Sequence, residues 1–138
     1  ADNLRHLIQE LEAQDYIHLR GHADLKQIYP CYQAYLTTSQ WETFGLTLME
    51  AAGTGLALLG FDARYGNPTF IKDGENGYLV PYSETMGEDL LVSQMADKIV
   101  FALESDLESI HQISYDLAKQ YLKPEILEAW RKLLIAIR

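Results

Sequence analysis

The chain has one cysteine, Cys31, among 138 residues, so no disulfide can form within it. This scarcity fits a reducing compartment, and we expect a cytoplasmic location with Cys31 as a small buried apolar residue. Basic residues are also few: 11 lysines and arginines stand against 20 aspartates and glutamates, for a net charge of -9. Such a surface repels polyphosphate backbones and acidic lipids. Nucleic acid is therefore excluded as an expected partner.

Long hydrophobic runs are absent as well. The most apolar stretch, Leu46 to Phe61, is too short to cross a membrane, contains Glu50 and is broken by glycines. The first residues, ADNLRHLIQELEAQDY, are charged throughout and do not resemble a signal peptide. We expect a soluble protein with at most peripheral membrane association. Its length and its 48% of hydrophobic residues predict one domain over residues 1–138.

Patterns typical of strands and helices alternate as far as Pro81. Strands are predicted at 16–21, 34–39, 56–61 and 77–81, and the continuous apolar run at 56–61 is typical of a parallel strand buried on both faces. Helices are predicted at 3–13, from Asp24 to a bend at Pro30, at 44–52, 91–103 and 107–121, and after Pro124, with residues 62–76 as a loop-rich segment. The order predicts an α/β fold: an incomplete Rossmann-like parallel sheet with C-terminal helices.

The segment SQWETFGLTLME contains two glutamates, Glu42 and Glu50. Glu42 lies in the turn after a predicted strand, at the edge where open α/β sheets bind ligands, and Glu50 lies in the following helix. Their separation of roughly 9 to 12 Å along a helix is too large for two acids that share a proton. Two such carboxylates suit different hydroxyls of one elongated ligand. Free amides are expected at the helix N-terminus, from Thr43, Phe44, Gly45 and Leu46.

Each glutamate alone also fits an ordinary role. An acid before a helix interacts favourably with the helix dipole, and an acid within a helix commonly faces solvent. Glu50 fits this alternative less well, because Leu46, Met49 and the two following alanines surround it in sequence. An ionised acid among apolar side chains indicates a function.

Glu42, seven residues and then Glu50, with FGLTLMEAAGTGLALL and YGNPTFIKDGENGYLV, resemble the sugar-donor half of the retaining family 4 glycosyltransferases of GT-B architecture. The resemblance covers residues 16–103. It implies that Glu50 binds the ribose and Glu42 the donor sugar. By the same resemblance Thr43 belongs to the nucleotide side, and Phe44, Gly45 and Leu46 line the sugar and pyrophosphate. It implies no metal and no other cofactor, and it assigns no catalytic residue to this chain.

Within that family, FDARYGNPTFIKDGENGYLVP is similar to transferases that modify surface polymers of Gram-positive bacteria. One branch places N-acetylglucosamine on serine-rich adhesins, and another glucosylates poly(glycerol phosphate). The resemblance thus implies transfer of N-acetylglucosamine or glucose from a UDP-sugar to a hydroxyl of a surface protein or polymer. The alternative is a non-catalytic glycosyltransferase-like module that binds a protein partner.

Further residues have two interpretations each. Tyr65, Gly66 and Asn67 either edge the sugar pocket or form a turn, and His22 either lies near the base or is a solvated loop histidine. The family's basic pair for the pyrophosphate, two strands and the N-terminal acceptor domain precede the region of resemblance. We therefore expect the C-terminal part of a GT-B transferase, inactive alone, whose open sheet edge is covered by a second copy or a partner glycosyltransferase subunit.

Overall fold

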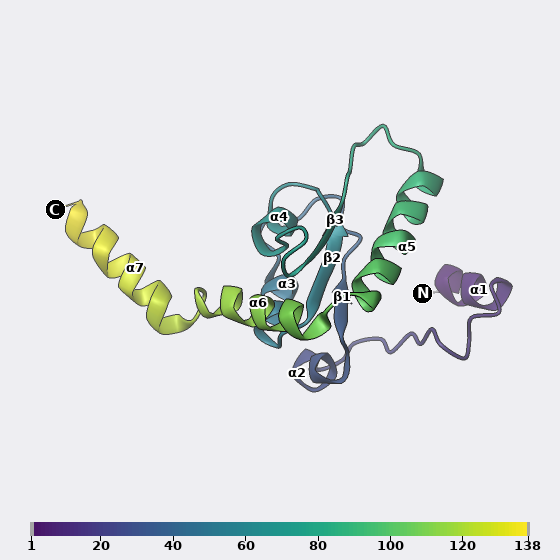
Figure 1. Cartoon of the computed structure of the whole chain (residues 1–138), viewed down its shortest axis with the longest axis horizontal. Coiled ribbons are helices and arrows are strands. Elements are labelled where there is room, and N and C mark those ends of the chain that lie inside the picture. Colours follow the sequence, from purple (N-terminus) through teal and green to yellow (C-terminus); the bar gives the residue numbers. More distant parts are fainter. Residues whose placement is uncertain (1, 138) are drawn as a thin grey trace.

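A computed structural model describes residues 2–137, which form an α/β structure around a parallel sheet (Figure 1). The sheet contains β1 (Ala34–Leu36), β2 (Ala57–Phe61) and β3 (Gly77–Val80), in that order. Ala34 of β1 lies opposite Ala57, and Leu58 of β2 lies opposite Gly77. Every residue of the central strand β2 is buried, as its continuous apolar run predicts. The predicted fold class is confirmed.

The helices alternate with these strands and then follow them. They are α1 (Asp2–Glu10), α2 (Leu25–Ile28) with the 3-10 turn η1 (Tyr29–Cys31), α3 (Leu46–Gly53), α4 (Gly66–Phe70), α5 (Glu88–Glu104), α6 (Leu107–Lys119) and α7 (Lys123–Ala136). Asp24 caps α2 by accepting a 3.1 Å hydrogen bond from the amide of Lys26. The helix ends before Pro30, as predicted.

Helices cover both faces of the sheet and give it two cores. Because strand side chains alternate between faces, Leu59 packs in a core with Leu91 and Met95 of α5. Leu58 packs in the other core, with Leu48 of α3 and Phe70 of α4. The sheet is therefore the middle of three layers, with helices packed against each of its faces.

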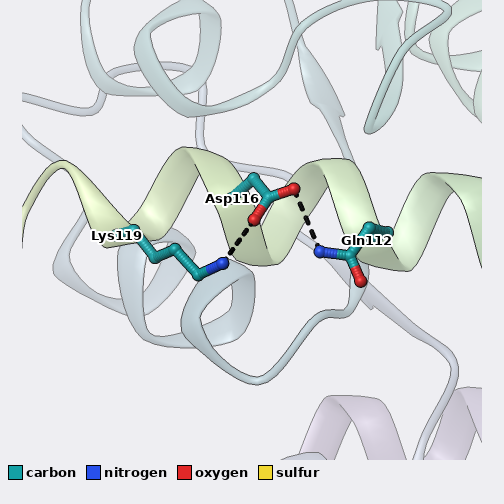
Figure 2. A network of polar contacts seen from close by, with 3 residues as sticks. All are labelled: Gln112, Asp116 and Lys119. Atoms are coloured by element: carbon teal, nitrogen blue, oxygen red, sulfur yellow. Dashed lines mark hydrogen bonds and ion pairs between the residues drawn. The ribbon is translucent and has the colours of Figure 1, made fainter.

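Helix α6 has one buried and one solvated face. Ser114 is fully buried and donates a 2.7 Å hydrogen bond to the carbonyl oxygen of Leu56. On the outer face the Asp116 carboxylate accepts from Lys119 at 2.6 Å and from Gln112 at 3.0 Å (Figure 2). Lys119, and then Gln112, hold the pKa of Asp116 below its ordinary value. All three side chains are exposed, so this network contributes little to the stability of the fold.

The strand predicted at residues 16–21 is wrong. Tyr16, Ile17 and Leu19 are exposed, and no strand of the described chain lies beside them. The amide of Ile17 instead donates to the oxygen of Ala13 at 2.9 Å. Aromatic and β-branched residues favour a strand only where a neighbouring strand accepts and donates the backbone hydrogen bonds.

The segment 62–76, predicted to be loop-rich, contains the short helix α4. Pro68 lies in the first turn of α4, where its missing N–H costs no helical hydrogen bond. The turn-forming composition therefore concealed a helix that buries Asn67 and Phe70. The burial expected for Cys31 is also wrong, because this residue lies exposed at the end of η1.

Helices α1 and α7 extend away from the sheet at the two ends of the molecule (Figure 1). Neither contains a buried residue within residues 2–137. The apolar side chains of α7 are exposed, among them Leu127 and Trp130, both at 57%. Within the same range, no helix combines the length and the apolar character needed to span a membrane.

Candidate functional site

The loop after β1 and the segment after β2 meet at the carboxyl edge of the sheet. Glu42 belongs to the first, and its amide donates to the carbonyl oxygen of Arg64 at 3.2 Å. In return, the Glu42 carbonyl oxygen accepts from the amides of Tyr65 at 2.6 Å and Gly66 at 2.7 Å. The half-buried Glu42 is therefore fixed by its own backbone, at the edge where open α/β sheets bind ligands.

Two glycines make this close approach feasible. A Cβ atom at Gly66 would lie 2.5 Å from the carbonyl oxygen of Phe44 and 2.7 Å from Cγ of Glu42. Gly45 has a φ of 89°, and a Cβ there would lie 2.9 Å from Leu48 Cδ1. A side chain at Gly66 would displace the segment that carries Glu42, and one at Gly45 would be strained by the left-handed backbone there.

Helix α3 begins at Leu46, not at Phe44 as predicted, because the left-handed backbone of Gly45 cannot continue a right-handed helix. The amides without intrahelical acceptors are therefore those of Leu46, Thr47 and Leu48. Thr43 and Phe44 lie in the preceding loop. The ring of Phe44 packs edge-on against Phe70, with centroids 5.3 Å apart, which holds this loop against α4.

A cavity of about 700 Å³ lies beside Glu50. It has the size of a small-molecule site. Its lining combines α3 with the segment around α2: His22, Ala23, Asp24, Leu25, Lys26, Tyr29, Glu50, Gly53 and Thr54. The structure thus brings His22 and Glu50 to one cavity. Among the residues it describes, no group of three or more histidines, cysteines or acids is arranged to hold a metal ion.

Glu50 is exposed, so the apolar surroundings expected from its sequence neighbours are wrong. Successive residues of an α-helix point about 100° apart, and Ala51 and Ala52 are fully buried on the side that faces the sheet. Glu50 instead points toward the cavity that it lines. An exposed carboxylate in this position is free to accept hydrogen bonds from the hydroxyls of a ligand.

Tyr29 forms the buried wall of this cavity. It is 6% exposed, its hydroxyl donates to the carbonyl oxygen of Thr47 at 3.4 Å, and its ring meets that of Tyr35 edge-on at 5.7 Å. Burial, and to a smaller extent the charges of Tyr35 and Glu50, raise the pKa of Tyr29 to about 12. A neutral phenol therefore stands near Glu50 at neutral pH.

The sequence did not point to Asp24, Lys26 or Tyr29 as site residues. The sequence predicts only a short helix in this segment, and His22, which precedes it, is the one residue there that indicates a ligand site. The segment around α2 lies beside α3 through a contact between residues distant in sequence, and the pattern of neighbouring residues does not predict such contacts.

The three residues predicted at the pocket edge have different environments. Tyr65 is exposed, and its ring meets that of Trp41 edge-on at 5.9 Å. Gly66 is buried against the loop that carries Glu42. Asn67 is fully buried, and its side-chain nitrogen donates to Phe61 at 2.9 Å and to Ser39 at 3.3 Å. Asn67 therefore lies beneath the site and does not form its edge.

Comparisons with known proteins show the family to which this fold belongs. The family model for glycosyl transferases, group 1, matches residues 1–115. The UDP-N-acetylglucosamine–peptide N-acetylglucosaminyltransferase GtfA subunit of Streptococcus gordonii is 51% identical over 138 residues. The match covers 99% of this chain and 27% of that relative, so the chain spans about a quarter of the relative's length.

Two crystal structures have the same fold over almost the whole chain. That of the pneumococcal O-GlcNAc transferase GtfA in complex with UDP and GlcNAc has a TM-score of 0.90 at 50% identity, covering 99% of this chain and 27% of that one. That of a GtfA/B complex has a TM-score of 0.90 at 51% identity, with the same coverage. The likeness confirms the predicted α/β architecture of the GT-B transferases.

Proposed function

The chain belongs to the group 1 glycosyl transferases, and from this membership we propose that it is the sugar-donor-binding part of a retaining N-acetylglucosaminyltransferase. One observation carries the proposal: Glu42 and Glu50 lie on either side of the α3 N-terminus, and Glu50 lines a cavity of about 700 Å³. The similar proteins described above bear N-acetylglucosamine and UDP in their names, which favours this sugar over glucose.

The two acids bind opposite ends of the sugar nucleotide. Glu50 accepts hydrogen bonds from the ribose hydroxyls, and the base enters the cavity near His22. The first amides of α3 face the diphosphate, because a helix N-terminus attracts anions. Glu42 accepts hydrogen bonds from the hydroxyls of the sugar, with Thr43 and Gly45 between the two ends. Hydrogen bonds to a carboxylate are stronger than those between neutral groups, so both acids add affinity.

The reaction moves the sugar to a hydroxyl of a protein. The bond between the anomeric carbon and the diphosphate oxygen breaks, the acceptor oxygen bonds to the same carbon with retained configuration, and UDP leaves with the proton that the acceptor hydroxyl loses. With a net charge of -9, this chain is poorly suited to compensate the diphosphate alone. We assign that compensation, and the acceptor site, to the remainder of the full-length protein. The reaction requires no metal or other cofactor.

A second transferase subunit is the partner we favour over a second copy of this chain. The crystal structure of a GtfA/B complex, which contains a protein similar to this one, supports such a pairing. The cytoplasm is the proposed location, because UDP-sugars are made there and the single cysteine requires no oxidising compartment.

Substitution of Glu50 tests the proposal in the full-length protein. Glu50→Ala should weaken binding of UDP-N-acetylglucosamine about 10- to 100-fold, the loss expected for a hydrogen bond to a charged group, and should reduce sugar transfer accordingly. Glu108→Ala is the matched control, because Glu108 is an exposed glutamate on α6 that does not line the cavity. Unchanged binding and transfer in Glu50→Ala would contradict the proposed role of Glu50, and a wild-type protein that binds no UDP-sugar would instead support the non-catalytic, protein-binding module.

A further inference from the structure

Asn67 is a fully buried polar residue that connects three segments at the carboxyl edge of the sheet. It lies in the first turn of α4, and its side-chain amide donates to the carbonyl oxygen of Phe61, at the end of β2, at 2.9 Å. The same nitrogen donates to the carbonyl oxygen of Ser39, in the loop after β1, at 3.3 Å. One side chain thus ties α4 to the ends of both strands.

The backbone next to Asn67 is the backbone that holds Glu42. Gly66 and Tyr65 donate their amides to the Glu42 carbonyl oxygen at 2.7 and 2.6 Å. Ser39, which accepts from Asn67, belongs to the same loop as Glu42. The loop is therefore attached to α4 twice, once through the Asn67 side chain and once through the amides just before it.

The chemistry of this contact requires an amide. Both hydrogens of the side-chain nitrogen are used, since each of two backbone carbonyls accepts one, and these acceptors fix the orientation of the amide. The Oδ1 atom is buried and has no hydrogen-bond partner among residues 2–137. A buried polar atom without a partner destabilises a fold. The unpaired Oδ1 thus lowers the stability that Asn67 contributes. What the side chain does provide is the pair of hydrogen bonds that its nitrogen donates.

We propose that Asn67 is a positioning residue for Glu42: it holds the Glu42 loop so that the carboxylate meets the donor sugar, without itself touching the ligand. This inference rests on the proposed role of Glu42 in sugar binding. Asn67 does not line the cavity at Glu50. Its loss should consequently weaken recognition of the sugar and leave binding of the nucleotide intact.

The test compares two ligands in the full-length protein. Dissociation constants for UDP and for UDP-N-acetylglucosamine are measured by calorimetry, and their ratio isolates the contribution of the sugar. Asn67→Ala and Glu42→Gln should each raise the ratio of the UDP-N-acetylglucosamine constant to the UDP constant about tenfold, as expected for a lost or misplaced hydrogen bond to a carboxylate. The UDP constant itself should stay within about twofold.

Asn76→Ala is the matched control. Asn76 is also 0% exposed; it donates to Phe70 at 2.9 Å and accepts from the amide of Lys72 at 2.7 Å. It lies just before β3, at the amino edge of the sheet, away from Glu42. Its loss should lower the melting temperature of the protein and leave the ratio unchanged. An equal rise of the ratio in Asn76→Ala would mean general loosening and would overturn the inference.

The remaining outcomes separate this inference from the proposed function. If Glu42→Gln raises the ratio and Asn67→Ala does not, Asn67 is not a positioning residue and the function stands. If Glu42→Gln leaves the ratio unchanged, the sugar-binding role of Glu42 is wrong and the inference falls with it. Should Asn67→Ala fail to bind UDP, Asn67→Ser, which keeps one hydroxyl donor, replaces it, and an unchanged ratio in that variant overturns the inference.

Discussion

The carbonyl oxygen of Glu42 accepts a hydrogen bond of 2.7 Å from the amide of Gly66. This bond joins the loop after β1 to the segment after β2, two parts of the chain that are distant in sequence. Glu50, by contrast, is positioned by helix α3 and lines the cavity of about 700 Å³, which Glu42 does not line. The two ends of the proposed ligand site therefore depend on different contacts, and substitutions can perturb one end without the other.

Gly66→Ala should disturb the end that carries Glu42. The new methyl group would lie 2.5 Å from the Phe44 carbonyl oxygen and 2.7 Å from Glu42 Cγ, so backbone must shift. We expect a loss of about 1–3 kcal/mol in the free energy of unfolding, as for other overpacked sites. Urea denaturation followed by circular dichroism measures it, and the affinity for UDP-N-acetylglucosamine should fall in the same variant.

Gly87→Ala is the control for that substitution. Gly87 has a φ of -66°, and a Cβ added there meets no atom within 4 Å. Its free energy of unfolding should change by less than about 0.5 kcal/mol. Equal losses of unfolding free energy in the two alanine variants would show that the close packing of Gly66 against Glu42 does not restrict the residue at position 66.

Tyr29 should ionise late in an alkaline titration. Burial raises its pKa from 10.0 to about 12, so the folded chain keeps this proton where the unfolded chain releases it. Its contribution to stability is therefore complete below pH 10 and is lost as the pH rises from 10 to about 12. Ultraviolet absorbance of tyrosinate should show one of the nine tyrosines titrating in a late phase.

Tyr29→Phe should remove that phase, whereas Tyr16→Phe, at an exposed position, should retain it because Tyr29 is still present. An undiminished late phase in Tyr29→Phe would show that Tyr29 is not the tyrosine whose pKa is raised.

Leu58→Ala should be among the costly substitutions. Leu58 lies in the central strand and is 0% exposed, so its truncation loses apolar burial and leaves a cavity, at about 2–5 kcal/mol. Leu133→Ala makes the same chemical change on α7, where the side chain is 52% exposed, and should cost about 0.5 kcal/mol or less. Urea denaturation of both variants makes the comparison. Similar losses would mean that α7 packs in solution against a surface that covers Leu133.

The sequence predicted the elements whose pattern is local. The run at 56–61 indicated a buried strand because every side chain there is apolar, and β2 is buried throughout. The strand predicted at 16–21 fails because its propensity is real but no neighbouring strand is present beside it. Helix α4 was missed because Gly66, Asn67 and Pro68 are turn-forming residues, and it is the burial of Asn67 and Phe70 that fixes this segment.

The sequence predicted where the two acids of the candidate site lie relative to the helix, but not the segment around α2 that lines the cavity with Glu50. The spacing of Glu42 and Glu50 placed one acid before a helix and one within it, and the structure has that arrangement. The exposure of Glu50 depends on which face of α3 packs on the sheet. The contact of Glu42 with Gly66 joins residues distant in sequence. Neither the exposure of Glu50 nor this contact follows from the pattern of neighbouring residues, so neither could be predicted from the sequence.

Calorimetric titration of the full-length protein with UDP-N-acetylglucosamine, and with GDP as the comparison, tests the central claim most directly when it is repeated with Glu50→Ala. We predict binding of the uridine ligand that is at least about tenfold tighter than that of GDP, and its loss by a similar factor in the variant. Equal affinity for UDP-N-acetylglucosamine in the wild-type protein and in Glu50→Ala would contradict the assignment of this cavity to a sugar nucleotide.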